Sequence, residues 1–129
     1  MTFDPSGAVV ECDSAVEVFE RLRERFVVTG KVQLAAVRLD GAPTSHELFV
    51  GVRDDEAVLC ATSDEGWSWH SHDVEKDHYV YRRDEVAFWG EPVEIDGYFY
   101  VDLPRALRLF AAFFEDPGAA LATTDWEIE

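Results

Sequence analysis

The sequence predicts an α+β fold in which an antiparallel sheet carries one helix before its strands and one after them. Two segments, one near each end of the chain, repeat apolar residues with the period of a helix. Between them, short segments of alternating or aromatic residues are separated by turn clusters, as in antiparallel strands. Helices that flank a set of strands favour packing on one antiparallel sheet. The length of 129 residues fits one domain, 1–129.

The first helix is expected to follow a loose lead-in over residues 1–12. Ser14 and Glu17 stand in the spacing of a capping box, which predicts a helix start near Asp13-Ser14. Gly30 fits the helix end, because glycine readily adopts the left-handed conformation found there. The apolar stripe of this helix consists of Ala15, Val18, Phe19, Leu22 and Phe26.

The middle of the chain is expected to form strands. These cover 31–39, 46–52, 57–62, 79–81 and 86–89. The acidic turn Arg53-Asp54-Asp55-Glu56 joins the second and third of them into a hairpin. Residues 91–97 are expected to form a loop around Pro92, and residues 98–101 an extended approach to the second helix.

The second helix is the best-defined element of the sequence. Asp102 suits its N-cap, and Pro104 suits its first turn, where a missing N–H does no harm. Asp116-Pro117-Gly118 ends it, and the alternating segment 125–129 predicts a terminal strand. The expected apolar stripe is Leu103, Leu107, Phe110 and Phe114, widened by Ala106 and Phe113.

The composition is strongly acidic. Asp and Glu number 27 against 11 Lys and Arg, which sets a formal net charge of -16. A compact domain with this charge repels nucleic acid and anionic lipid and attracts basic surfaces. We therefore expect a protein partner with a basic surface, and neither a nucleic acid nor a membrane. A salt-rich cytoplasm or a coding bias is an equally good source of the acidity.

The termini and the cysteines indicate a cytoplasmic protein. The N-terminal residues lack the basic region and apolar run of a signal peptide, and no segment has about 20 apolar residues to span a bilayer. Cys12 and Cys60 are isolated, so free thiols are expected. We expect a monomer or weak dimer with no cofactor.

Catalytic and metal sites have little support. His70, His72 and His78 are zinc-ligand types, but their spacing matches no zinc motif. Cys12 lies just before the first helix, where the helix dipole would stabilise a thiolate, but no neighbouring His or Lys activates it. We therefore predict no metal, no catalytic residue and no enzymatic activity.

Large aromatic residues beside carboxylates provide the best candidate for a binding surface. Rigid aromatic side chains anchor protein interfaces, and charged rims steer association. Trp67 and Trp69 are the expected anchors, whereas Trp89 and Trp126 are expected to be core residues. The expected charged rim consists of Asp54, Asp55, Glu56, Asp64 and Glu65.

Residues 47–129 resemble a known family through a series of short motifs. In chain order, these are Leu48-Phe49-Val50-Gly51-Val52 with Val58-Leu59, then Tyr79-Val80-Tyr81, Val86-Ala87-Phe88-Trp89, Asp102-Leu103-Pro104-Arg105-Ala106-Leu107, Phe113-Phe114-Glu115-Asp116-Pro117-Gly118 and Trp126-Glu127. The pattern is similar to the first-numbered Imm family of immunity proteins from bacterial polymorphic toxin systems.

The resemblance implies a small cytoplasmic α+β protein that binds a cognate toxin domain and neutralises it by occlusion. Many such toxins are nucleases or deaminases with basic clefts, which an acidic inhibitor suits. The family has no catalytic residues, so none is implied. Two alternatives stay open: an acidic adaptor for another partner, and a small metal-binding enzyme that uses the three histidines.

Overall fold

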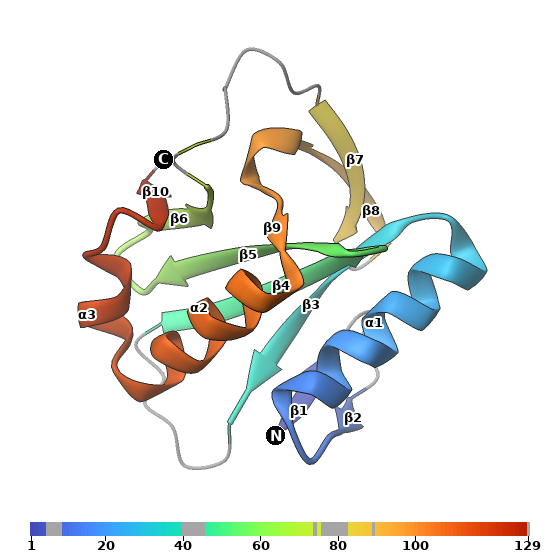
Figure 1. Ribbon diagram of the computed structural model, residues 1–129, viewed down its shortest axis with the longest axis horizontal. Helices are drawn as coiled ribbons and strands as arrows, with labels where there is room; N and C mark the ends of the chain where they lie inside the picture. The colour runs from blue at the N-terminus through green and yellow to red at the C-terminus, as the bar shows by residue number, and fades with distance from the viewer. Residues whose placement is uncertain (5–8, 40–45, 74, 76–82, 89, 129) are drawn as a thin grey trace.

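The protein has an α+β fold, shown by a computed structural model that describes residues 1–4, 9–39, 46–73, 75, 83–88 and 90–128 (Figure 1). Its helices are α1 (Ala15–Thr29), the 3-10 turn η1 (Gly97–Phe99), α2 (Leu103–Glu115) and α3 (Pro117–Leu121). Its strands are β1 (Thr2–Asp4), β2 (Val10–Glu11), β3 (Val32–Arg38), β4 (His46–Arg53), β5 (Glu56–Ser63), β6 (Ser68–Ser71), β7 (Arg83–Phe88), β8 (Glu91–Asp96), β9 (Val101–Asp102) and β10 (Trp126–Ile128). In this part of the chain, no helix is long and apolar enough to cross a membrane.

The sheet is built around the long strands β3, β4 and β5. The strand order is β10-β6-β5-β4-β3-β1-β2. Each outer long strand divides one edge between two partners: β3 pairs with β1 over 36–38 and with β7 over 32–34. In the same way, β5 pairs with β6 over 60–62 and with β9 over 56–57. The contact between β3 and β7 is parallel, whereas the other strand pairs are antiparallel, as expected.

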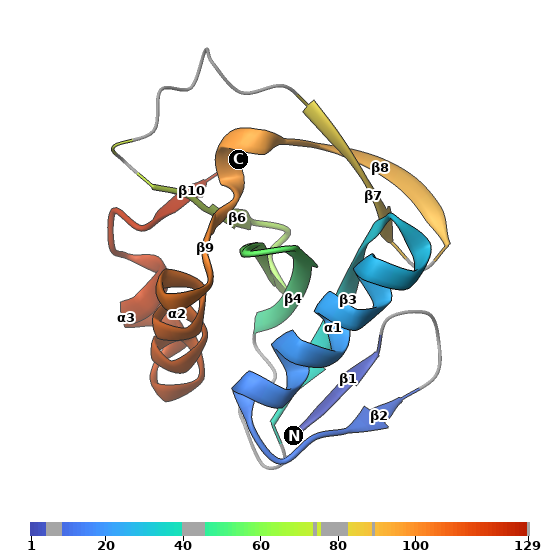
Figure 2. The same cartoon turned by 45° about the vertical axis from the view of Figure 1, so that its right-hand side comes forward.

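The two faces of the sheet are covered by different structures. Helices α1 and α2 lie over one face, and the β7–β8 hairpin with η1 lies over the other (Figure 2). Successive residues of a strand point to opposite faces. Leu59 therefore packs in the cluster under the helices, while the adjacent Val58 packs under the hairpin.

The ends of α1 confirm the sequence prediction. The Ser14 side chain accepts a hydrogen bond from the Glu17 N–H at 3.2 Å. The Glu17 carboxylate accepts in turn from the Asp13 N–H at 2.8 Å, one residue earlier than in a standard capping box. Gly30 ends the helix with φ 70°, and its N–H donates to the Phe26 carbonyl.

Helix α2 begins at the predicted cap, but its buried face is shifted. Asp102 accepts from the Arg105 N–H at 2.8 Å. Phe110 is 2% exposed and meets Phe19 of α1 edge-on at 5.6 Å, so this face contacts a helix as well as the sheet. Leu107 and Phe114 are only partly buried, whereas the unpredicted Leu109 is buried. The fully buried residues of α2 are Ala106, Leu109, Phe110 and Phe113.

The β4–β5 hairpin also confirms its prediction, with pairing from His46↔Ser63 to Arg53↔Glu56. Gly51 of β4 lies very close to the side chains of Val32, Leu34 and Val58. A Cβ at this position would be 2.7 Å from the Val32 Cγ1 atom, too close for a normal contact. Glycine at position 51 therefore lets β3 and β4 lie tightly together under the hairpin-covered face.

Three sequence predictions about local structure are wrong. The described part of the 1–12 lead-in belongs to the sheet, because β1 pairs with β3 and Phe3 is 1% exposed. The expected loop over 91–97 is mostly strand β8. Among the described strands, β8 pairs only with β7, so Pro92 can occupy an edge where no donor is needed. Residues 97–99 form a 3-10 turn instead of continuing in extended conformation. The predicted strand 79–81 and Trp89 lie outside the described residues.

A buried hydroxyl at the end of β6 links β5 to the 3-10 turn η1. Ser71 is fully buried, and its Oγ accepts from the Leu59 N–H at 2.9 Å. The same hydroxyl donates to the Phe99 carbonyl at 3.0 Å. The Ser71 side chain thus replaces ladder hydrogen bonds where β6 ends and before β9 begins, so these buried backbone groups remain satisfied.

Candidate partner-binding surface

The structure divides the seven predicted contact residues between the two ends of β5. Asp54, Asp55 and Glu56 lie at the turn between β4 and β5, and the other four lie at or just after the turn between β5 and β6. Strand β5 has eight residues, which at roughly 3.3 Å per residue separates the turns by about 25 Å. The seven residues therefore do not form one compact patch.

The carboxylates of the β4–β5 turn are partly neutralised by neighbouring arginines. Arg23 of α1 pairs with Asp54 at 3.4 Å, and Arg53 pairs with Glu56 at 3.3 Å. Asp54 has a φ of 52°, unusual for a residue with a side chain. The Asp55 carbonyl accepts from the Leu103 N–H at 3.2 Å, so this turn also supports the start of α2.

The turn between β5 and β6 presents an exposed indole beside two exposed carboxylates. Asp64 and Glu65 are exposed, and Gly66 turns the chain with φ 88°. The backbone N–H of Trp67 donates a hydrogen bond to the Ser63 hydroxyl at 3.2 Å, and this bond holds the backbone from which the indole projects. The Trp67 side chain itself is 53% exposed, as expected for an interface anchor.

Trp69 is less accessible than its prediction as an anchor implies. It is half-buried and packs against the core cluster under the helices. Its ring lies 5.8 Å from that of His46, and it stands opposite Ile128 on β10. Trp126, by contrast, is 5% exposed and belongs to the core, as predicted.

The histidines contact aromatic rings. The His70 ring stacks on Phe99 with centroids 4.5 Å apart, and the His72 Nδ1 atom lies 2.9 Å from the Tyr98 hydroxyl. His78 lies outside the described residues. Within the described ranges, no three His, Cys, Asp or Glu side chains come together as a metal site.

Cys12 is placed unfavourably for nucleophilic chemistry. The residue is 5% exposed, and burial and the nearby Glu17 carboxylate raise the pKa of its thiol. A raised pKa lowers the thiolate fraction at neutral pH.

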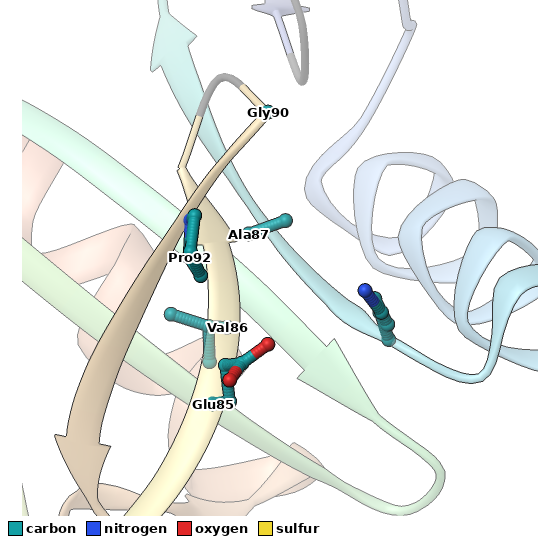
Figure 3. Close-up of a pocket in the computed structure, with 6 residues that line it drawn as sticks. Glu85, Val86, Ala87, Gly90 and Pro92 are labelled. Carbon is teal, nitrogen blue, oxygen red and sulfur yellow. The ribbon is translucent and has the colours of Figure 1, made fainter.

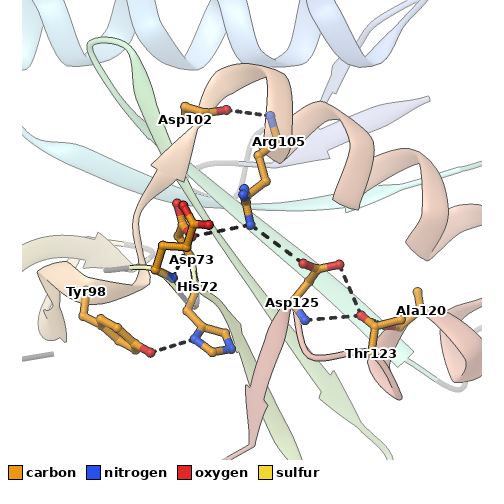
Figure 4. Close-up of polar contacts among 9 residues, drawn as sticks. His72, Asp73, Tyr98, Asp102, Arg105, Ala120, Thr123 and Asp125 are labelled. Atoms are coloured by element: carbon orange, nitrogen blue, oxygen red, sulfur yellow. Dashed lines mark hydrogen bonds and ion pairs between the residues drawn. The ribbon is translucent and has the colours of Figure 1, made fainter. Parts of the chain in front are cut away.

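One polar cluster missed by the sequence analysis surrounds Arg105. Figure 4 shows this side chain reaching from the first turn of α2 towards Asp73 and Asp125, at 3.7 and 3.9 Å. The arginine thus connects the segment after β6 with the segment before β10. The position of Arg105 in the helical repeat indicates only that its side chain points away from the apolar stripe. No local pattern in the sequence identifies Asp73 and Asp125 as its partners.

A second unpredicted cluster joins the β7–β8 hairpin to the main sheet. The Tyr100 hydroxyl donates to the Asp84 carboxylate at 2.7 Å, and Arg53 pairs with the same carboxylate at 3.1 Å. The Arg53 guanidinium lies 4.0 Å over the Tyr100 ring. Burial, followed by the hydrogen bond to Asp84, strongly raises the pKa of Tyr100. The phenol therefore stays neutral and acts as a structural donor.

A shallow pocket of about 140 Å³ lies on the β7–β8 hairpin (Figure 3). Its lining residues are Lys31, Glu85, Val86, Ala87, Gly90 and Pro92. The exposed Lys31 and Glu85 are its charged groups.

The chain matches no protein-family model, and no curated protein matches its sequence. The resemblance to the first-numbered Imm family is therefore a hypothesis that rests on the motifs in the sequence.

Proposed function

We propose that the protein is an immunity protein, which binds a cognate toxin domain with a basic surface and neutralises it by occlusion. The carrying observation is an excess of surface carboxylates within a folded α+β protein of net charge -16. Much of the positive charge is already used within the chain. Arginines that form ion pairs with its own carboxylates are Arg21, Arg23, Arg38, Arg53 and Arg105.

The proposed mechanism is electrostatic replacement of the toxin's substrate. A nuclease or nucleic-acid deaminase binds a polyanion in a basic cleft. Carboxylates on a rigid protein surface present a similar field without a bond that the toxin can cleave. Charge complementarity also accelerates association, to above about 10⁸ M⁻¹s⁻¹ at low salt against roughly 10⁵–10⁶ M⁻¹s⁻¹ without steering.

The proposal requires that a nuclease or deaminase toxin domain be encoded close to this gene, and such a domain, once identified and purified, is the reagent for the test. Its activity on nucleic acid is measured with and without an equimolar amount of the protein, and an unrelated protein of equal net charge serves as the control. We expect inhibition by this protein alone and an association rate that falls steeply from low to high salt. Full toxin activity at tenfold excess of the protein would refute the proposal.

The same measurement distinguishes the two alternatives. An acidic adaptor would bind a basic partner and leave the partner's activity unchanged. A metal-binding enzyme would carry stoichiometric zinc that is lost when His70 and His72 are replaced. Elemental analysis of the purified protein tests that alternative directly, and we expect less than stoichiometric metal.

A further inference from the structure

The two acidic turns at the ends of β5 differ in whether arginines of the chain pair with their carboxylates. At the β4–β5 turn, Asp54 and Glu56 each have an arginine partner. At the β5–β6 turn, no ion pair within the described residues joins Asp64 or Glu65. The second turn thus retains both of its negative charges for an external partner.

The second turn also lies beside an apolar surface that crosses several strands. Trp69 stands opposite Ile128 on β10, and Ile128 is 56% exposed. Trp67 directly precedes β6 and is hydrogen-bonded to Ser63 at the end of β5, so its exposed indole lies at the start of the strand that carries Trp69. His46 reaches this face from β4 and contacts the Trp69 ring. We call the surface formed by His46, Asp64, Glu65, Trp67, Trp69 and Ile128 the β5–β6 patch.

Outside this patch, the most exposed apolar side chains of the described residues are Val27 and Val28 in the last turn of α1, at 74% and 84% exposure. Both are small and aliphatic. The others are also aliphatic, namely Val9, Val16, Leu39 and Val93. Binding energy at protein interfaces concentrates in Trp, Tyr and Arg, and valine is under-represented among such hot spots. The aromatic β5–β6 patch is therefore the better candidate for a specific contact.

We infer that the β5–β6 patch is the surface that binds the partner, and that the partner contributes an arginine or lysine flanked by an apolar side chain. This inference rests on the proposed function. A cation is attracted to the face of an indole ring, and Asp64 and Glu65 add charge complementarity beside that indole. Ile128 and the accessible part of Trp69 supply apolar contact area for the neighbouring side chain.

Nuclear magnetic resonance can test the surface before the toxin is known. The probe is a capped Gly-Arg-Leu-Arg-Gly peptide, titrated into the isotope-labelled full chain. Matched controls are the same peptide with citrulline in place of arginine and with glutamate in place of arginine. We expect peak shifts at the Trp67 and Trp69 indoles and at 126–128, with roughly fivefold weaker binding of the citrulline peptide.

Variants connect the probe to the mechanism. We expect roughly fivefold weaker peptide binding for Trp67→Ala and for the double change Asp64→Asn with Glu65→Gln. The matched controls are Val28→Ala and the double change Asp54→Asn with Asp55→Asn, which should bind normally. Thermal melts confirm that each variant is folded. Shifts centred on 52–57 or on α1, no detectable binding, or equal binding of the citrulline peptide would overturn the inference.

The toxin assay separates this inference from the proposed function. If wild-type protein inhibits the toxin and the Trp67→Ala variant inhibits equally well, the patch is wrong while the function stands. If the peptide binds the patch and wild-type protein does not inhibit the toxin, the function is wrong while the patch stands.

Discussion

The two faces of the central sheet are held in place by different kinds of interaction. The helix-covered face relies on apolar packing, with Phe110 of α2 meeting Phe19 of α1 above the strands. The hairpin-covered face adds a polar cluster, in which Arg53, Asp84 and Tyr100 link β4, β7 and the segment before β9. Apolar packing does not titrate, whereas a cluster of charges and a phenol does, so the two faces should respond differently to mutation and pH.

The largest effect is expected on the helix-covered face. Phe110→Ala should reduce the free energy of unfolding by about 3–5 kcal/mol, because it removes a buried ring and leaves a cavity. Thermal and urea unfolding measure the change. Arg108→Ala, on an exposed position of the same helix, is the control and should change stability little. A loss below 1 kcal/mol would mean that this face is not the main source of stability.

A smaller loss is expected on the hairpin-covered face. Arg53→Met keeps much of the side chain's length but removes the cation from Asp84 and from the Tyr100 ring. We expect the free energy of unfolding to fall by about 1–3 kcal/mol. The lower part of this range is expected because the two ions are about one third exposed and water partly screens them. Arg23→Met, which breaks the exposed pair with Asp54, is the control and should cost less than about 1 kcal/mol. Equal losses in both variants would remove the distinction between a structural cluster and a surface pair.

The pH dependence should identify the polar face directly. The pKa of Tyr100 is raised by folding, so its contribution to stability is fully present below the unfolded pKa of 10.0 and is lost as pH rises above it. One pH unit above that value, the expected loss is about 1.4 kcal/mol. Urea unfolding from pH 8 to 11 measures it, and Tyr100→Phe should show a smaller decline. Identical slopes for the two proteins would contradict the assignment.

The smallest effect on stability is expected at the exposed Trp67 of the β5–β6 patch. Trp67→Ala should change the free energy of unfolding by no more than about 0.5 kcal/mol, because the side chain is 53% exposed. If Trp67 is an interface hot spot, the free energy of binding to the proposed toxin partner should weaken by about 2 kcal/mol or more, roughly thirtyfold in affinity. Trp69→Ala should also reduce stability, because the half-buried ring packs on the core. Melting and titration of both variants test this separation.

The sequence predicted elements that are specified locally. Ser14, Gly30, Asp102 and Pro104 act within their own helix ends, so the caps of α1 and α2 could be assigned from a few residues. The β4–β5 hairpin was equally predictable, because its strands are adjacent in the chain. The interpretation failed at β1 and β8, which are stable as strands only through pairing with other segments.

The candidate surface shows the same division. The exposed indole of Trp67 and its acidic turn could be inferred from consecutive residues. The pairing of Asp54 with Arg23 spans 31 positions, and nothing local indicates it. Since such contacts decide which carboxylates keep their charge for a partner, the sequence could name the acidic turns but could not separate them.

Because β3 and β5 each share one edge between two short strands, their long edges are covered and the sheet ends in short strands. This arrangement bears on aggregation. Open strand edges are templates for pairing with other molecules. In the described structure, the sheet ends at β2 with two residues and at β10 with three, and the outer strand β8 carries Pro92 and exposed glutamates. Short edges, a proline and carboxylates all oppose intermolecular strand pairing. These edges should therefore oppose self-association at high protein concentration, which the proposed inhibitor would need in order to exceed the amount of its target.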